Sequence, residues 1–155
     1  MPSGRAASFL AEGFDWASLG EGTVVDVGGS SGGVSILLAE RFPALNFVVQ
    51  DLSEAIEGAA EKVPTNVAQR IRFMTHDFFT DQTVVAKVYL LRAIFHNWPD
   101  AYCVKILQKL VPALQDGAKI IINDSLLPEP GTLTVLPERN VRYVVSVAKQ
   151  DSMGR

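Results

Sequence analysis

A glycine-rich turn is the part of this sequence best suited to hold a small ligand. Residues 26–33 read DVGGSSGG and close a short apolar run. Gly28 and Gly29 permit a sharp turn and a close approach of the backbone to a ligand, and the helix start that follows offers free N–H groups to a carboxylate or phosphate. The dinucleotide fingerprint G-x-G-x-x-G requires a glycine where this chain has Ser30, so the turn alone does not identify the ligand.

Two aspartates that follow later apolar runs narrow the choice of ligand. Asp51 lies 23 positions after Gly28, and a carboxylate about 20 residues beyond such a turn is placed to accept hydrogen bonds from ribose hydroxyl groups. Asp77 could reach an adenine amino group, with Phe78 or Phe79 stacking on the base; it could also be a helix cap or a loop carboxylate. The glycine turn and Asp51 together predict an adenosine-containing ligand.

The hydrophobic pattern supplies a scaffold that brings these residues to one edge. Short β-branched runs alternate with amphipathic stretches, which indicates an α/β fold: an open, doubly wound, mostly parallel sheet with helices on both faces. The predicted strands are residues 23–28, 46–50, 70–74, 87–91 and 118–123. The predicted helices are residues 32–41, 53–62 with Ser53 as cap, 99–114 with Pro99 as first residue, and 138–149. Ligands bind such sheets beyond the carboxyl ends of the strands.

Composition and charge limit the classes to which the protein can belong. Its 155 residues give room for one domain, and 48% hydrophobic with 20% charged residues exclude a wholly disordered or coiled-coil chain. The net charge of −3 speaks against a general nucleic-acid binder. Because the sequence has no long apolar run, no secretory signal and a single cysteine, Cys103, we expect a cytoplasmic protein without a membrane partner. The two histidines and the cysteine show no metal-ligand spacing, so no metal is expected.

Residues 90–100, LLRAIFHNWPD, connect these observations to a known family. The turn VDVGGSSG, the two aspartates Asp51 and Asp77, and Arg92 four positions before His96 in HNWPD together resemble the class I S-adenosylmethionine-dependent O-methyltransferases of the plant and fungal phenol and polyketide type. The resemblance runs from about residue 16 to about residue 128. It implies a Rossmann-like methyltransferase fold, S-adenosyl-L-methionine (SAM) as cofactor, and methyl transfer to a small aromatic substrate, at a phenolic or polyketide hydroxyl group, in secondary metabolism.

The same resemblance assigns a set of residues to the cofactor. The methionine part would face the glycine turn, with Arg92 near its carboxylate. The ribose would contact Asp51, and adenine would be flanked by Asp77 and Phe78. The complete set is Asp26, Gly28, Gly29, Ser30, Asp51, Asp77, Phe78 and Arg92.

Catalysis is assigned to two further residues by the resemblance. His96 would be the general base that removes the hydroxyl proton, a task for which an imidazole titrating near neutral pH is suited. Asp124, at the end of the last predicted strand, would orient the imidazole ring. From the residues alone, His96 could also be an ordinary loop histidine, and Asp124 a strand-end carboxylate that faces water.

The family differs from this chain in length. Its members are usually more than twice as long, with an N-terminal helical domain that forms the dimer and two C-terminal strands that form an antiparallel hairpin. We therefore expect residues 1–155 to be one SAM-binding core, with a helical lead-in over 1–20, a loop and terminal helix over 125–155, and no final hairpin. The edge of the last strand would be unpaired unless residues 138–149 or another chain covers it. A homodimer is a further expectation, especially for a longer native chain.

Two other functions remain compatible with these residues. A methyltransferase-like protein or fragment could bind the cofactor, or keep only the fold, without transferring a methyl group. A nicotinamide-dependent oxidoreductase is the third hypothesis. Binding measurements with SAM, S-adenosylhomocysteine (SAH) and NAD separate the third hypothesis from the first two.

Overall fold

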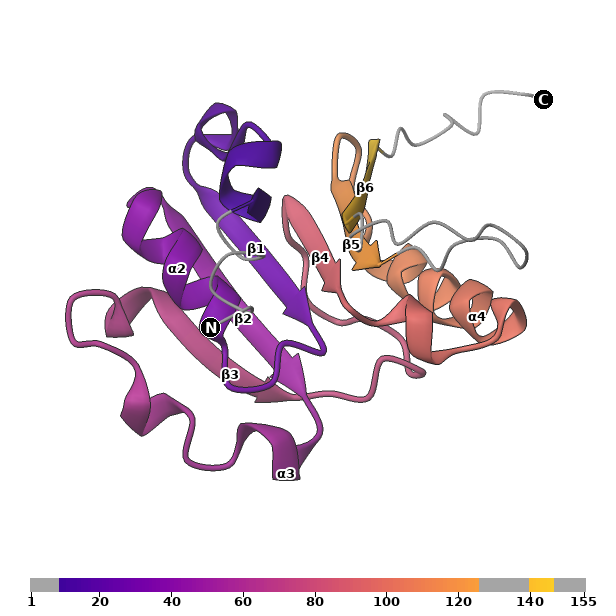
Figure 1. Cartoon of the computed structure of the whole chain (residues 1–155), viewed down its shortest axis with the longest axis horizontal. Helices are drawn as coiled ribbons and strands as arrows, with labels where there is room; N and C mark the ends of the chain where they lie inside the picture. Colours follow the sequence, from indigo (N-terminus) through magenta and orange to yellow (C-terminus); the bar gives the residue numbers. More distant parts are fainter. Residues whose placement is uncertain (1–8, 126–139, 147–155) are drawn as a thin grey trace, which may run out of the picture.

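Six strands form one sheet in the computed structural model, which describes residues 9–125 and 140–146 (Figure 1). In spatial order the strands are β3 (Ile71–Thr75), β2 (Leu45–Asp51), β1 (Gly22–Val27), β4 (Val88–Arg92), β5 (Lys119–Ser125) and β6 (Asn140–Ser146). The strands from β3 to β5 pair in parallel, and β6 is antiparallel to β5. Strand β1 lies between β2 and β4. From β1 the chain adds β2 and β3 on one side and then β4 and β5 on the other, so the strand order reverses between β1 and β4. The predicted doubly wound α/β fold is confirmed.

Helices and 3-10 turns connect these strands. They are η1 (Trp16–Leu19), α2 (Gly33–Arg41), α3 (Ser53–Ile56), η2 (Ala60–Lys62), η3 (Ala68–Arg70), η4 (Phe95–Asn97), α4 (Asp100–Leu110) and η5 (Val111–Ala113), and residues 9–13 are also helical. The helix predicted over 99–114 is divided into α4 and η5, and Pro99 is the N-cap of α4 rather than its first residue. Among the described residues, no helix has the length and apolar character needed to cross a membrane.

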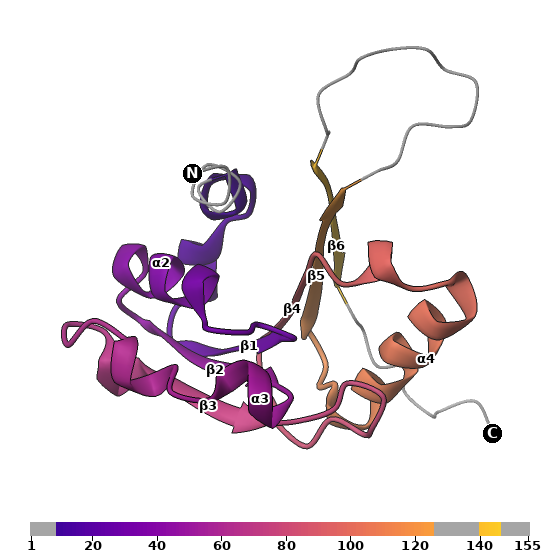
Figure 2. The ribbon, with the colours of Figure 1, turned by 60° about the horizontal axis from the view of Figure 1, so that its bottom comes forward.

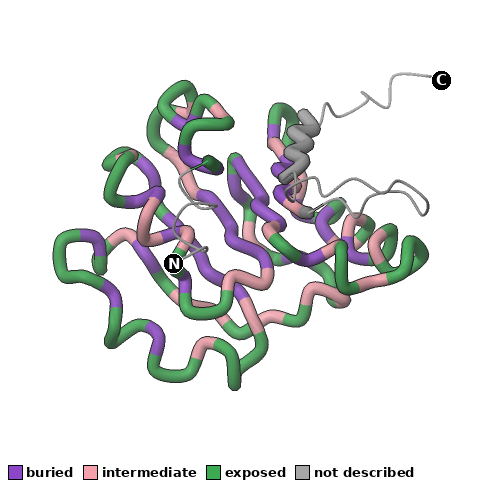
Figure 3. The backbone as a smooth tube through the Cα atoms, in the orientation of Figure 1, coloured by how far each residue is buried: buried purple, intermediate pink, exposed green. Residues whose placement is uncertain are grey.

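The two faces of the sheet carry separate apolar cores, because successive residues of a strand point to opposite sides. On one face Val24 of β1 packs in a cluster with Leu38 of α2. On the other face Val25 of β1 packs in a cluster with Ile106 of α4. Figure 2 shows α2 and α4 on opposite sides of the sheet, and Figure 3 shows that the buried backbone follows the central strands. This double packing leaves the carboxyl ends of the strands as the open edge.

The helix predicted over residues 53–62 is much shorter in the structure. Helix α3 ends at Ile56, and a 3-10 turn resumes only at Ala60. Gly58 between them has a φ of +71°, a left-handed conformation that an α-helix does not contain. Ser53 is also not the cap; Leu52 takes the N-cap position. The helix that the regular spacing of alanines and glutamates predicted is therefore interrupted at a single glycine.

The helix predicted over residues 138–149 is wrong. The described part of that segment is β6, which pairs with the outer edge of β5 in the register Ile120↔Val145 and Ile122↔Tyr143. An unpaired edge strand exposes a row of backbone hydrogen-bonding groups, and the β-branched sequence NVRYVVS is well suited to satisfy them. Residues 138, 139 and 147–149 lie outside the described part of the chain. Within the described residues, one antiparallel strand rather than a hairpin of two follows β5.

Candidate functional site

The carboxyl ends of the parallel strands bring the predicted site residues to one edge of the sheet. The glycine turn follows β1, while Asp51 ends β2 and Arg92 ends β4. Asp77 lies just after β3, and Asp124 is near the end of β5. Ligands of doubly wound sheets bind where the strand order reverses. In this sheet that point is at the carboxyl ends of β1 and β4.

The turn after β1 requires glycine at two positions. A Cβ atom at Gly28, whose φ is +70°, would lie 2.6 Å from Ile94 Cδ1. At Gly29 a Cβ atom would lie 2.5 Å from Asp26 Cγ and 2.8 Å from Val49 Cγ1. The Gly29 N–H donates to the Gln50 carbonyl at 3.0 Å, which holds the turn against β2. The glycines therefore allow the turn to lie directly on the sheet; the predicted close approach to a ligand stays a prediction.

Asp51 is fixed by backbone donors on both carboxylate oxygens. The N–H of Ser30, whose φ is +53°, donates to Asp51 Oδ2 at 2.9 Å, and the N–H of Leu52 donates to Oδ1 at 2.8 Å. A carboxylate has about four acceptor sites, so each oxygen can accept one further hydrogen bond. Asp51 is thus oriented by the glycine turn and can still accept two hydroxyl groups.

Asp26 lies behind the turn rather than in the cavity beside it. Its carboxyl group is 3% exposed and accepts a hydrogen bond from Ser35 Oγ at 2.8 Å. Burial raises the pKa of Asp26 from 3.8 to about 6, partly offset by the Ser35 hydrogen bond and by the positive charge of Arg92. Asp26 does not line the cavity and supports the turn and α2 from inside, so its predicted contact with the cofactor stays a prediction.

A cavity of about 230 Å³ opens next to Asp51. It is lined by Asp51, Leu52, His76, Asp77, Phe78, Phe79 and Trp98. The Trp98 ring packs edge-on to Phe79 with centroids 4.9 Å apart, and to Phe78 at 6.2 Å. Asp77 Oδ1 accepts the N–H of Phe79 at 2.9 Å, which fixes the turn that carries both phenylalanines. The cavity therefore combines the carboxylate of Asp51 with aromatic walls.

The sequence prediction missed part of this cavity wall. Leu52 and His76 line the cavity but were not among the predicted site residues. Leu52 could have been found from its position directly after Asp51. Burial lowers the pKa of His76, with a smaller opposing effect from Asp77, which favours a neutral imidazole in the wall.

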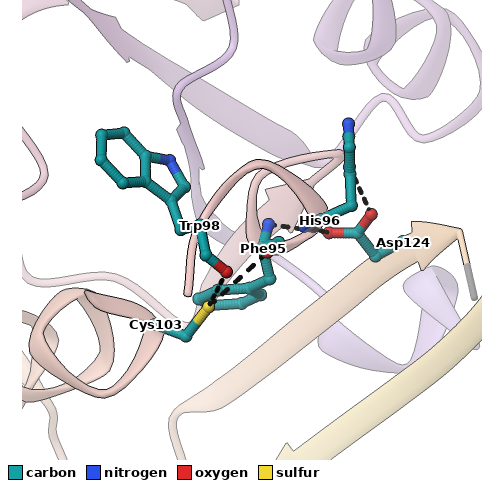
Figure 4. Close-up of polar contacts among 5 residues, drawn as sticks. All are labelled: Phe95, His96, Trp98, Cys103 and Asp124. Carbon is teal, nitrogen blue, oxygen red and sulfur yellow. Dashed lines mark hydrogen bonds and ion pairs between the residues drawn. The ribbon is translucent and has the colours of Figure 1, made fainter. Parts of the chain in front are cut away.

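The predicted catalytic pair is assembled from two strand ends. His96 Nδ1 and Asp124 Oδ1 are 2.6 Å apart, and Figure 4 shows the two side chains facing each other across the gap between η4 and β5. Asp124 Oδ2 also accepts the N–H groups of Phe95 at 2.8 Å and of His96 at 3.2 Å. One carboxylate thereby fixes both the ring and the backbone of His96. The hydrogen bond assigns the proton to Nδ1 and leaves the Nε2 lone pair for another group.

The chain changes direction sharply between β4 and His96. Ala93 adopts a φ of +56°, which is uncommon for a residue with a side chain, and its N–H donates to the Asn123 carbonyl at 2.8 Å. This turn directs η4 sideways over the end of β5. The left-handed residue is what allows His96, which follows β4, to meet Asp124 of β5.

Two buried donor atoms near this turn have no hydrogen-bond partner in the described structure. They are Arg92 Nε and Asn123 Nδ2. The two residues are register partners on β4 and β5, so their side chains project from the same face of the sheet. Buried donors without partners are costly, so both atoms are available to an acceptor group at this edge of the sheet. Asn123 was not predicted, although it directly precedes Asp124.

No metal centre is apparent in the part of the chain that the structure describes. Over residues 9–125 and 140–146, His, Cys, Asp and Glu form no group of three or more that could hold a metal ion. The groups at this edge are instead oriented carboxylates, a guanidinium, an amide and an imidazole. These groups can hydrogen-bond the hydroxyl, amino and carboxylate groups of an organic ligand.

Comparisons with known proteins agree on one family. The model of the O-methyltransferase domain matches residues 10–151. A relative, the "Grayanic acid biosynthesis cluster O-methyltransferase" of Cladonia grayi, is 54% identical over 141 residues, which are 90% of this chain and 31% of the relative. This chain therefore spans about a third of the length of the curated relatives it matches.

Solved structures of this kind contain the expected type of cofactor. CalO1, a methyltransferase of calicheamicin biosynthesis in its SAH-bound form, superposes with a TM-score of 0.70 at 28% identity, covering 81% of this chain and 38% of CalO1. NcsB1, an O-methyltransferase of neocarzinostatin biosynthesis in complex with SAM and 2-hydroxy-5-methyl naphthoic acid, has a TM-score of 0.68 at 31% identity, covering 76% of this chain and 36% of NcsB1.

Proposed function

This chain belongs to the O-methyltransferase domain family, and we propose that it binds SAM and uses His96 as the general base in methyl transfer to an aromatic hydroxyl group. The observation that carries the proposal is the 2.6 Å contact between His96 Nδ1 and Asp124 Oδ1 at the same edge of the sheet as Asp51. An oriented imidazole beside an adenosine-type cavity is the arrangement that this reaction needs.

The residues present fit the cofactor in their chemistry. Asp51 would accept hydrogen bonds from the ribose hydroxyl groups, and the cavity walls formed by Phe78 and Trp98 would contact the adenine ring. The carboxylate of the methionine part would accept from Arg92, whose Nε is buried without a partner. Its opposite charge makes Arg92 the natural partner for that carboxylate.

The glycine turn would contribute by position rather than by side chains. Because Gly28 and Gly29 place the backbone against β2, the cofactor can lie close to the strand ends. Ser30 already donates its N–H to Asp51, so the turn and the ribose site form one unit.

His96 would then handle the proton of the acceptor hydroxyl group. When bound, SAM supplies a methyl group that is already activated on a sulfonium sulfur, so little is required beyond alignment and proton removal. His96 Nε2 would take the proton as the hydroxyl oxygen bonds to the methyl carbon, while the carbon–sulfur bond breaks and SAH is left. Asp124 would keep the Nδ1 proton in place and stabilise the positive charge that develops on the ring.

The aromatic nature of the acceptor rests on comparison. NcsB1 is described as a complex with a naphthoic acid, and a further neighbour at 25% identity as a complex with apigenin. The His96 side chain is 36% exposed, so an acceptor can approach it from solvent. We extend this substrate class to the present chain as part of the proposal.

The proposal is tested by incubating the 155-residue chain with methyl-labelled SAM and a panel of phenols and naphthols, then measuring label in the product. Transfer in the parent and its loss in His96→Ala are expected. Binding of SAH without any transfer to the panel would instead support a cofactor-binding protein. Tight NAD binding with no response to SAH would contradict the proposal.

A further inference from the structure

Two buried glutamine side chains form a reciprocal hydrogen-bonded pair. Gln50 Nε2 donates to Gln82 Oε1, and Gln82 Nε2 donates to Gln50 Oε1, both at 2.8 Å. The residues are 0% and 3% exposed. Gln82 Oε1 also accepts the N–H of Val84 at 3.2 Å. Because buried amides are costly unless paired, the pair favours one arrangement of the two chain segments that carry it.

These segments are β2 and the connection from β3 to β4. The connection, residues 76–87, passes from the edge strand β3 across β2 and β1 to β4, and this described segment contains no helix. Parallel strands are usually joined through a helix, and a long irregular connection in a compact domain is commonly functional. Without a helix, the path of the connection depends on individual contacts such as the Gln82 N–H, which donates to the Lys109 carbonyl at 2.8 Å.

The connection is attached to β2 on both sides of the cavity wall. At the start of the wall, the N–H of His76 donates to the Asp51 carbonyl at 2.9 Å. After the wall, Gln82 pairs with Gln50, the residue that directly precedes Asp51. Residues 77–81, which include Asp77 and the two phenylalanines of the cavity, are therefore held between two attachments to the same strand end. Asp51 lies at that strand end and lines the opposite side of the cavity.

We propose that Gln50 and Gln82 are positioning residues that set the separation between Asp51 and the 77–81 segment, and so fit the cavity to an adenosine group. The inference rests on the proposed function, since it takes this cavity as the adenosine site. Neither glutamine lines the cavity. They act through the wall that they hold and make no contact with the ligand.

The experiment compares Gln50→Met, Gln82→Met and the double variant with the parent chain. Methionine has a similar length but cannot form the amide pair. Three quantities are measured: hydrogen exchange of residues 77–81 in the ligand-free protein, the Kd for SAH by calorimetry, and the thermal unfolding midpoint. Gln108→Met, at an exposed position on α4, is the matched control and should change none of them.

Each single variant should exchange faster over residues 77–81 and should bind SAH about tenfold more weakly. Each should also unfold at a lower temperature, because one buried amide is left without its partner. The double variant removes both amides, so it should regain thermal stability. Its exchange rate and its Kd should remain raised, because the attachment to β2 is still absent.

Two results would overturn the inference. A double variant that regains SAH affinity together with thermal stability would make the pair a purely structural contact. Unchanged exchange over residues 77–81 in the single variants would mean that the glutamines do not hold the wall. A parent chain that binds no SAH contradicts the proposed function, and the exchange rates of the ligand-free variants then decide separately whether the pair holds this segment.

Discussion

The adenosine side of the site and the histidine side are held in different ways. On the adenosine side, backbone N–H groups fix both oxygens of Asp51, and the cavity wall is attached to β2 at two points. On the histidine side, a single carboxylate holds His96, whose side chain is 36% exposed. The geometry of the proposed cofactor site is therefore fixed largely by backbone groups, whereas that of the proposed base depends on the hydrogen bonds of a single carboxylate, Asp124.

This difference predicts on which side of the site a substitution changes both ligand binding and the stability of the fold. Changes at the adenosine side disturb buried groups that also support the fold, so binding and stability should change together. Changes at the histidine side affect an exposed turn, so the chemistry should be lost while the fold and cofactor binding remain. The variants below test this separation.

The largest effect is expected for His96→Ala. Removing a general base typically costs about 10²–10⁴-fold in rate, so methyl transfer to a phenol should fall by that factor in single-turnover measurements. The Kd for SAH and the unfolding midpoint should not change, because His96 does not line the cavity. Asn97→Ala, at the exposed neighbouring residue, is the control. Unchanged transfer in His96→Ala would exclude the base role.

The next effect concerns stability at the glycine turn. The pKa of Asp26 is raised from 3.8 in the unfolded chain to about 6 in the fold, so its contribution to stability is greatest below pH 3.8 and is lost as the pH rises through about 6. Asp26→Asn stays neutral and should be more stable than the parent by roughly 2–3 kcal/mol near pH 8, at 1.4 kcal/mol per pKa unit.

Urea unfolding between about pH 4 and pH 8 measures this difference. The advantage of Asp26→Asn should shrink as the pH falls toward the lower end of the range. Asp81→Asn, whose side chain is 64% exposed, controls for the loss of one acidic charge. A constant difference across the range would mean that Asp26 ionises in the fold as readily as in the unfolded chain.

A smaller kinetic effect is expected for Asp124→Asn. Loss of a hydrogen bond to a charged partner corresponds to about 10–100-fold in rate, and the amide can no longer stabilise a positive imidazole. The rate of transfer should fall while the Kd for SAH stays constant. Combining this change with His96→Ala should cost no more than His96→Ala alone, because the two residues act as a unit. An additive loss would mean that Asp124 acts independently of His96.

The smallest effect is expected for Asp51→Ala, with about tenfold weaker SAH binding measured by calorimetry. Unlike the changes at His96, this one should also lower the unfolding midpoint, because the Ser30 N–H loses its acceptor. Glu54→Ala, at an exposed position in α3, is the control. Equal SAH affinity in Asp51→Ala and the parent would remove the ribose assignment.

The central parallel strands β1, β2 and β4 were predictable because each is a short, largely buried apolar run. The 23-residue spacing from Gly28 to Asp51 predicted a carboxylate for ribose hydroxyl groups, which stays a prediction; it did not foresee that the Ser30 N–H of the turn donates to Asp51. Proximity of His96 and Asp124 came from the family resemblance. Nothing in the local pattern indicates that a residue after β4 will turn toward the end of β5.

The glutamine pair and the strand over residues 140–146 depend on long-range contacts, which leave no periodic pattern in the sequence. Gln50 and Gln82 are 32 residues apart, and nothing in their surroundings marks them as partners. The failure over residues 138–149 has a similar cause: the segment contains both helix-compatible and β-branched spacing, and the unpaired edge of β5 decided between them. Tertiary context overrode local preference in this case.

The left-handed turn at Ala93 has a consequence for how this region can evolve. A positive φ at a residue with a side chain costs on the order of 1–2 kcal/mol, so the bend persists only while its anchor to the Asn123 carbonyl is kept. In the stretch between Arg92 and His96, a β-branched or bulky side chain at position 93 would add to this strain. Insertion or deletion of one residue there would rotate the imidazole away from β5, so the length of this stretch should be more resistant to change than its composition.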